Sequence, residues 1–229
     1  MSRHPVAGSD ACAPTASVEG LVPLDASFFE RETSLVARDL LGKILVTSVG
    51  DTVCGGRIVE TEAYLGADDP GSHAATRGVT TRNRVMYGPP AHAYVYFTYG
   101  VHHMLNLVTE PVGVAGAVLV RAVEPLWGAD IMEHRRGRSG IAVSNGPAKV
   151  AEAFGVDLRL NDERLGGVIA VYDAAHVPDE AVSISGRVGL SAGHDLELRF
   201  YVTDSAYVSR GRTGPRLTRR RTDDDRGTG

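Results

Sequence analysis

The chain has 229 residues, of which 43% are hydrophobic and 23% charged, and its formal net charge is −4. This size and composition are typical of one globular domain in solution. No apolar run is long enough for a membrane span, and the first residues lack the basic and apolar segments of a signal peptide. We therefore expect a cytoplasmic protein without a membrane partner.

The cysteines and histidines exclude the common metal and disulfide frameworks. Cys12 and Cys54 are the only cysteines and do not form a CxxC pair, so neither a disulfide nor a zinc site is expected. The histidines that stand near other polar residues match no ligand spacing: His73, His92, His102 and His103. There is also no phosphate-binding glycine loop and no nucleophile elbow. The sequence therefore predicts no metal and no cofactor.

The negative net charge argues against a nucleic-acid partner, but the charges are unevenly distributed. Residues 200–229 carry seven basic and four acidic groups. Basic residues that could form one face are Arg77, Arg82, Arg84, Arg135, Arg136, Arg138, Lys149, Arg210, Arg212 and Arg216. Local rather than total charge governs phosphate binding, so a basic face and scattered solvated arginines both remain open.

Along the chain we expect a disordered leader over residues 1–20, one domain over residues 21–208 and a flexible tail over residues 209–229. Asp25 or Ser27 can cap a helix that runs to Leu41 and ends at Gly42. Residues 43–49 and 53–64 alternate like strands and are joined by a Gly-Asp turn, which predicts a hairpin.

The rest of the domain reads as a strand meander followed by helices and further strands. Residues 66–92 form a long loop with a short helix at 83–86, and a loop of this length is usually functional. The expected strands are 93–99, 104–109, 117–123, 168–172, 182–188 and 196–202. The expected helices are 126–135 and 147–154, separated by a basic, flexible loop over residues 135–145.

The first candidate site lies where the strand 53–64 opens into the long loop. Glu62 and Tyr64 stand at the end of this strand and His73 follows in the loop. A partly buried carboxylate can act as a general base. The alternation alone favours a simpler interpretation, in which Glu60 and Glu62 form the solvated side of an edge strand.

Two further groups can carry chemistry. Tyr94 and Tyr96 share one face of an aromatic strand, which favours sheet packing, and Tyr99 stands at a hairpin tip. An exposed ring at a tip needs a partner to contact. Arg121 lies in an otherwise apolar strand and should therefore be paired, with Glu124 or Glu62.

Several segments resemble the alkyladenine (3-methyladenine) DNA glycosylase family in order and spacing. They are residues 59–64 (Val-Glu-Thr-Glu-Ala-Tyr), 81–84 (Thr-Arg-Asn-Arg), 94–96 with Tyr99-Gly100, Asn106, 119–125, 146–149 and 199–202. The resemblance covers residues 22–208, and the segment 59–64 is its most specific part.

The resemblance implies an α+β fold: a single domain with a curved, mostly antiparallel sheet, packed helices and a protruding β-hairpin, like a formyltransferase C-terminal domain. It implies a monofunctional glycosylase of base excision repair, without lyase activity, that flips 3-methyladenine or hypoxanthine out of duplex DNA and hydrolyses the N-glycosidic bond. Its partner would be double-stranded DNA with a damaged purine. We expect a monomer without cofactors, associated with the nucleoid if the source is bacterial.

The resemblance also implies a role for particular residues. Glu62 would activate water, which Arg121 and the backbone carbonyl of Val188 would hold. The base pocket would consist of Tyr64, His73, Tyr96 and Asn106, with Asn106 rejecting the amino group of guanine. Tyr99 would fill the space that the flipped base leaves. Residues expected at the DNA backbone are Arg82, Arg84 and Lys149.

Two other functions remain open from the residues. A non-catalytic nucleic-acid-binding module would bind in a salt-dependent manner without releasing a base, but it needs no glutamate at position 62. A nucleoside hydrolase for small molecules would leave Tyr99 and the basic loops unexplained.

Overall fold

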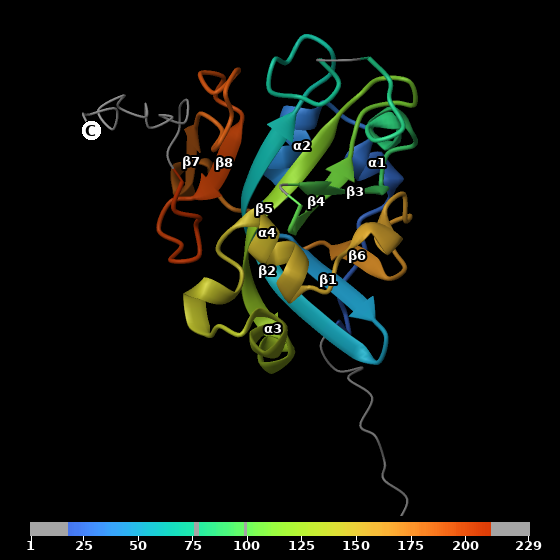
Figure 1. Ribbon diagram of the computed structural model, residues 1–229. Coiled ribbons are helices and arrows are strands. Elements are labelled where there is room, and N and C mark those ends of the chain that lie inside the picture. The colour runs from blue at the N-terminus through green and yellow to red at the C-terminus, as the bar shows by residue number, and fades with distance from the viewer. Residues whose placement is uncertain (1–17, 76–77, 99, 212–229) are drawn as a thin grey trace, which may run out of the picture.

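An antiparallel sheet curls through the centre of the molecule (Figure 1). The computed structural model describes residues 18–75, 78–98 and 100–211. Strands lie in the order β3-β4-β5-β2-β1-β6, while β8 pairs with β2 and β7 pairs with β8. Their bounds are β1 Ile44–Val49, β2 Thr52–Tyr64, β3 Ala93–Thr98, β4 His102–Val108, β5 Ala117–Trp127, β6 Ile169–Tyr172, β7 Val182–Ser185 and β8 Arg199–Val202.

The long strand β2 is a central strand of the sheet and not an edge. Strand β5 pairs with it from Gly55 to Tyr64 on one side. On the other side β1 covers its first half, up to Arg57, and β8 covers Glu60 to Glu62. The expectation of a solvated edge strand is therefore wrong, because β8 arrives from about 140 residues later in the chain and buries the second half of β2.

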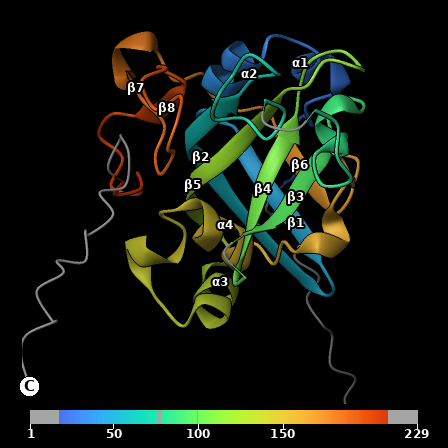
Figure 2. The ribbon, with the colours of Figure 1, turned by 45° about the horizontal axis from the view of Figure 1, so that its top comes forward.

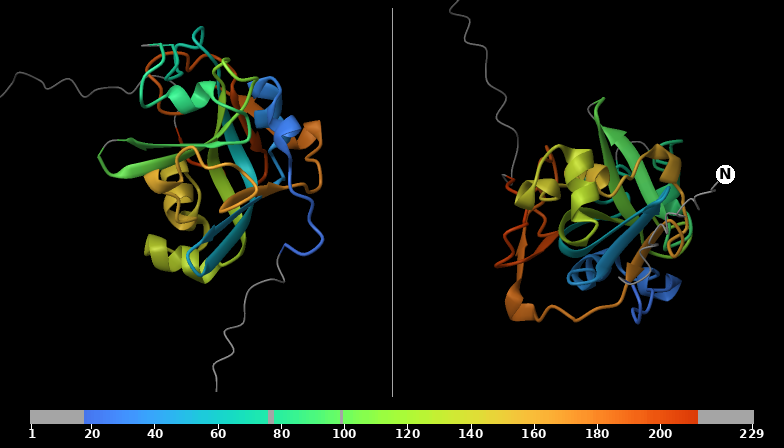
Figure 3. Two further views of the ribbon diagram at one scale, coloured as in Figure 1. Left: turned by 90° about the vertical axis from the view of Figure 1, so that its right-hand side faces the viewer. Right: turned by 90° about the horizontal axis from the view of Figure 1, so that it is seen from below.

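Short helices pack on both sides of this sheet (Figures 1 and 3). The α-helices are α1 Ala26–Phe29, α2 Thr33–Asp39, α3 Ala129–Arg136 and α4 Pro147–Ala153, and 3-10 turns span Arg84–Tyr87, Gly140–Val143, Leu158–Leu160 and Asp179–Ala181. Helix α2 contacts β2 and β5, whereas α4 contacts β4 and β5 and carries α3 beside it. No helix within the described ranges is long and apolar enough to cross a bilayer. The single α+β domain that the sequence analysis expects is confirmed.

The hairpin of β3 and β4 projects from the body, as Figures 2 and 3 show. At its root the Tyr94 side chain packs with Val85, Met86 and Val108 in a small apolar cluster, separate from the main core. This cluster anchors the hairpin to the loop that precedes it.

The expected helix from residue 25 to 41 is two helices. Asp25 caps α1 as predicted, but the backbone leaves the helical region at Glu30. The Thr33 amide then donates to the Glu110 carboxylate at 2.8 Å. The first turn of α2 is therefore capped by a side chain from the loop that follows β4. Local sequence contains no signal for such a long-range cap.

The expected helix from residue 126 to 135 begins later, because β5 continues to Trp127. Gly55 lies opposite Trp127, and a Cβ at Gly55 would come within 2.0 Å of the indole ring. Because Gly55 has no side chain, the indole ring can lie over it, and β5 can pair with β2 as far as Trp127. The loop that follows α3 is also more ordered than expected, since Val143 in its 3-10 turn is buried.

The packed domain reaches further than residue 208. Ser209, which we expected in a flexible tail, is 8% exposed and bonds to the buried Glu60. Residues 1–17 and 212–229, and with them most of the expected leader and tail, lie outside the described residues.

Candidate active site

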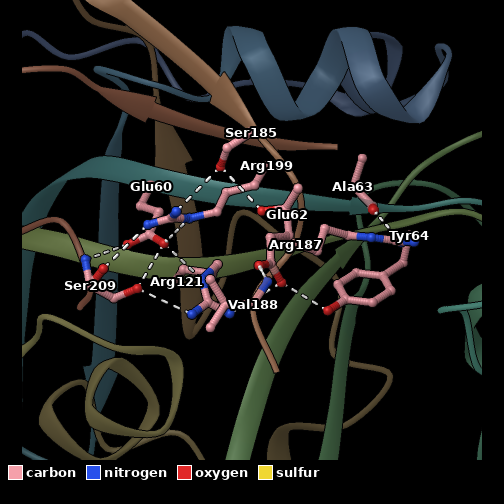
Figure 4. Close-up of polar contacts among 11 residues, drawn as sticks. Glu60, Glu62, Ala63, Tyr64, Arg121, Ser185, Arg187, Val188, Arg199 and Ser209 are labelled. Carbon is pink, nitrogen blue, oxygen red and sulfur yellow. Dashed lines mark hydrogen bonds and ion pairs between the residues drawn. The ribbon is translucent and has the colours of Figure 1, made fainter. Parts of the chain in front are cut away.

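Glu62 is a fully buried carboxylate that three elements hold (Figure 4). Its Oε1 accepts from the backbone amide of Val188 at 2.7 Å, and its Oε2 accepts from the Tyr64 hydroxyl at 2.8 Å. The Arg121 guanidinium completes the set, with Nη1 3.1 Å from Oε2. Removing a carboxylate from water costs several kcal/mol, and these donors offset that cost.

Glu60, two residues earlier, is equally buried and belongs to the same network. Its Oε1 accepts from Nε of Arg121 (2.8 Å), from Nε of Arg199 (2.7 Å) and from the Ser209 hydroxyl (2.8 Å). Its Oε2 accepts from the Ser209 amide at 2.6 Å. We call Glu60, Glu62, Arg121, Arg199 and Ser209 the polar floor.

Two β-bulges explain how Arg121 reaches both carboxylates. Ile58 pairs with Val123 and Glu60 with Ala122, which leaves one extra residue on β2. Thr61 then pairs with Val120, so that Arg121 is the extra residue on β5. Bulges of this kind re-aim a side chain next to a site. Here the bulge frees Arg121 from the ladder and lets it bridge Glu60 and Glu62.

The charges of the polar floor stabilise one another. Burial alone would raise the pKa of Glu60, but Arg121 and Arg199 hold that pKa below its ordinary value. Burial alone would lower the pKa of Arg121, but the neighbouring carboxylates of Glu62 and Glu60 have the larger effect and raise it above its ordinary value. Glu60 and Arg121 therefore keep their charges although both are buried.

A second buried ion pair positions Val188. Arg187 and Asp69 are both fully buried and form two bonds of 2.6 Å. Asp69 also accepts from the amides of Leu65 and Gly71, while Arg187 donates to the carbonyl of Ala63 at 2.9 Å. The pair thus ties the loop after β2 to the loop that carries Val188.

A small pocket opens beside the floor. Its lining consists of Tyr64, Gly71, His73, Met86, Tyr94, Tyr96, Asn106 and Leu190. We call Tyr64, His73, Tyr94, Tyr96 and Asn106 the aromatic wall. Gly71 leaves room here, because a Cβ would come within 2.6 Å of the Arg187 guanidinium and 2.7 Å of Leu190.

The aromatic wall is held by contacts among its own members. The rings of His73 and Tyr96 meet edge to face at 4.7 Å, and His73 Nδ1 lies 3.0 Å from the Tyr94 hydroxyl. Asn106 stands opposite Tyr94 in the ladder and donates to its carbonyl at 3.0 Å. These contacts present ring faces and edges to the pocket in a fixed arrangement.

The wall is electrically neutral at neutral pH. Burial raises the pKa of Tyr94 to about 12 and also raises the pKa values of Tyr64 and Tyr96. Burial, with a contribution from Arg82, lowers the pKa of His73 below 6.5. The five side chains of the aromatic wall therefore offer uncharged groups to the pocket, next to the charged side chains of the floor.

The comparisons with known proteins agree with this geometry. The sequence model of the methylpurine-DNA glycosylase family matches residues 27–206. The chain belongs to this family. A Chlorobaculum tepidum protein named "Putative 3-methyladenine DNA glycosylase" is 44% identical over 195 residues, which cover 84% of this chain and 93% of that protein. Proteins with the same name from Methanoculleus marisnigri (47% identical) and Carboxydothermus hydrogenoformans (44%) cover 82% of this chain and 98% of their own length.

The structure brings together most of the residues that the resemblance to this family selects. Glu62, Arg121 and Val188 meet in the floor region, and Tyr64, His73, Tyr96 and Asn106 meet in the wall. Arg121 pairs with Glu62, one of its two expected partners, but its second partner is Glu60 and not Glu124. For Val188, the contact that the structure shows is the amide on Glu62, whereas the expected role concerns its carbonyl.

The residues expected at the DNA backbone differ in exposure. Arg82 is exposed beside the wall, with its guanidinium 5.0 Å from the centre of the Tyr96 ring. Arg84 is exposed on the same loop, whereas Lys149 is half-buried on α4 and donates to Asn145. Tyr99, Arg77, Arg212 and Arg216 lie outside the described residues.

Two arginines of the proposed basic face have structural partners in this glycosylase family member. Arg135 donates to Thr52 (2.6 Å) and to the carbonyl of Ala153 (3.0 Å). Arg136 pairs with Glu152 and donates to the Val143 carbonyl. These bonds fasten α3 to α4 and β2, so the basic face is smaller than the sequence suggests.

Sequence reasoning missed the roles of Asp69, Asn83, Arg199 and Ser209. Asn83 is 2% exposed, donates to the carbonyls of His73 and Gly78, and thereby holds the loop that carries His73. Residues 81–84 and 199–202 belong to the segments that resemble the family, but nothing in the local sequence shows which of their side chains are buried. Among the described residues no three His, Cys, Asp or Glu side chains gather as a metal site would need.

Proposed function

We propose that this protein is a monofunctional DNA glycosylase that removes alkylated or deaminated purines, 3-methyladenine and hypoxanthine, from duplex DNA during base excision repair. One observation carries the proposal: Tyr64 lines the pocket and donates to Glu62. A base in the pocket would therefore place its sugar beside a buried carboxylate. We expect the enzyme to act as a monomer on chromosomal DNA in the cytoplasm.

In the proposed reaction Glu62 takes a proton from a water molecule whose oxygen attacks C1′ of the sugar. The bond between C1′ and the purine nitrogen breaks, and its electron pair leaves with the base. An N-alkylated purine is cationic and becomes neutral on departure, so it needs no strong acid, whereas hypoxanthine is neutral and must take up a proton from water as it leaves. Arg121 and the carbonyl of Val188 would hold the water, with Arg121 fixed by its bonds to Glu60 and Glu62.

The neutral aromatic wall suits a cationic base. Electron-rich ring faces attract a cation by about 0.5–2 kcal/mol. The low pKa of His73 keeps its imidazole uncharged near neutral pH, which avoids repulsion of the substrate. Asn106, buried at the wall beside Tyr94, would contact the purine edge and exclude the extra amino group of guanine.

Access to the pocket requires that the base leave the duplex. Unstacking a base costs a few kcal/mol, and less for a damaged base. Tyr99 lies in sequence between Thr98 of β3 and His102 of β4, and we expect it to fill the vacated space, as apolar wedges do in other minor-groove binders. Arg82, Arg84 and Lys149 would contact phosphates.

The lysines support hydrolysis without strand cleavage. A glycosylase with lyase activity commonly forms a Schiff base through an amine. The chain has two lysines, and neither lines the pocket. Lys43 lies just before β1 and pairs with Asp173, just after β6, at 2.5 Å. Lys149 on α4 donates to Asn145.

The decisive experiment is a base-release assay. Duplex DNA treated with a methylating agent, duplex DNA with one hypoxanthine and undamaged duplex DNA are incubated with the protein, and free bases are separated and identified. We expect free 3-methyladenine and hypoxanthine and intact abasic strands. Salt-dependent binding without any released base would instead show a non-catalytic binding module.

The wedge is tested separately. Tyr99→Ala should weaken binding to duplex DNA with an abasic-site analogue, because nothing then fills the gap. Unchanged affinity in this variant would remove Tyr99 from the proposal while leaving the chemistry of Glu62 intact.

A further inference from the structure

Glu60 is a fully buried carboxylate that does not touch the pocket but carries four hydrogen bonds. Four donors converge on it, from β5, from β8 and from the segment after β8. Charge-assisted hydrogen bonds of this kind are the strongest in proteins and fix orientation as well as energy. Glu60 does not line the pocket, and the guanidinium of Arg121 bridges its carboxylate to that of Glu62 (Figure 4).

The segment after β8 closes the network from outside the part of the chain that the family model matches, which ends at residue 206. Ser209 donates to Glu60 through both its amide and its hydroxyl, and its hydroxyl accepts from Nη2 of Arg121 at 3.1 Å. Gly211 packs on Val188, since a Cβ there would lie 2.2 Å from the Val188 side chain. This segment therefore touches the groups on both sides of Glu62.

We propose that Glu60, capped by Ser209, is a positioning residue that fixes Arg121 and limits its pairing with Glu62 during N-glycosyl hydrolysis. The guanidinium uses Nε for Glu60, Nη1 for Glu62 and Nη2 for Ser209. Glu62 therefore receives one branch of Arg121 rather than a bidentate pair. The inference rests on the proposed function of Glu62 as the base.

The charge balance gives the direction of the effect. The floor holds two carboxylates and two guanidinium groups, which sum to zero. Glu60→Gln keeps the shape but leaves one uncompensated positive charge near Glu62, which favours the charged form of Glu62 and makes it a weaker base. Charged and titratable groups surround Glu62 from five elements. Glu60 and Tyr64 come from β2 and Arg121 from β5. The others are Tyr96 of β3, Arg199 of β8 and Arg187 of the loop after β7.

The test is the single-turnover rate of base release from methylated duplex DNA as a function of pH, for the wild-type protein, Glu60→Gln and Ser209→Ala. We expect the acidic limb of the profile to move to lower pH in Glu60→Gln, and the plateau rate to fall by about 10- to 100-fold because the water is misplaced. Ser209→Ala should move the limb in the same direction by less. Affinity for abasic-analogue DNA should stay unchanged in both.

Two matched controls separate positioning from folding. Glu110→Gln alters a bonded carboxylate outside the floor, and Ser183→Ala removes a hydroxyl that bonds to Thr203 on the β7–β8 side of the sheet. Both should keep the wild-type profile. If Glu60→Gln does not fold, Ser209→Ala decides, because it retains the amide bond to Glu60.

The outcomes distinguish this inference from the proposed function. If the wild-type protein releases no base, the proposed function fails. If the wild-type protein releases base and Glu62→Gln does not, but Ser209→Ala and any folded Glu60→Gln keep the wild-type acidic limb, the positioning role of Glu60 is overturned, whatever their melting temperatures.

Discussion

The polar floor and the aromatic wall lie next to each other and are built in opposite ways. In the floor, two buried carboxylates form ion pairs with two buried guanidinium groups, and each carboxylate accepts several hydrogen bonds. The wall contains no charged group, and its rings contact one another and the open pocket. Tyr64 belongs to the wall and bonds to the floor, so it joins the two.

The difference indicates a division of labour. Preorganised charges in a site that excludes water are suited to the reacting centre, since they need no rearrangement during the reaction. Neutral ring faces are suited to binding a flat base of either charge state. We therefore expect changes to the floor to affect rate and stability, and changes to the wall to affect affinity and substrate choice.

The largest effect should come from the floor carboxylate itself. Glu62→Gln retains the shape and one oxygen for the Val188 amide but removes the base, so release should slow by about 100- to 10,000-fold. Single-turnover assays on methylated duplex DNA measure this directly. Release at the wild-type rate would exclude Glu62 as the base.

The ion pair that supports the floor should dominate stability. Asp69→Ala leaves Arg187 buried without its partner, and we expect a loss of about 3–5 kcal/mol in the free energy of unfolding. Asp39→Ala is the control, because the Asp39–Arg31 pair is about one third exposed and should contribute less than about 1 kcal/mol. Urea unfolding of both variants tests the contrast, and equal losses would contradict it.

A change in the wall should weaken binding in a charge-dependent way. Tyr96→Leu removes a ring face, so affinity for DNA with a cationic alkylated purine should fall by about 0.5–2 kcal/mol, and affinity for hypoxanthine DNA by less. Competition binding measures both. Tyr172→Leu, at the end of β6, serves as the control, and an equal loss for the two lesions would rule out the cation–π contribution.

The smallest effect concerns pH and His73. Since its pKa is lowered in the folded protein, folding is favoured most above pH 6.5, and part of this stability is lost as the pH falls through the folded pKa. His73→Asn should therefore show a flatter dependence of melting temperature on pH between neutral and mildly acidic conditions. The exposed His134 provides the control: His134→Asn should retain the wild-type slope.

How far the sequence leads depends on how local each feature is. Glu62 and Tyr64 lie two residues apart on one strand, and their association with His73 and Tyr96 was predictable from the order of the family's segments. The alternation around Glu60 is that of an edge strand and predicts a solvated side chain. Its burial depends on β8 and Ser209, which are 139 to 149 residues away.

The bulges and the second ion pair have the same character. Nothing in the residues around Val59 or Arg121 shows that the ladder slips at both places. Asp69 reads as part of a loop turn, and its partner Arg187 follows 118 residues later. The sequence therefore predicts which side chains meet at the pocket and Glu62 better than it predicts which side chains hold them in place.

The most direct test measures both halves of the site in parallel. The rate of base release and the affinity for duplex DNA with an abasic analogue or a lesion are determined for Glu62→Gln and Tyr96→Leu. The account predicts that Glu62→Gln loses release and keeps binding, whereas Tyr96→Leu loses affinity for the cationic lesion and keeps most of the rate at saturation. If both variants lose rate and affinity in the same proportion, the division between the polar floor and the aromatic wall is contradicted.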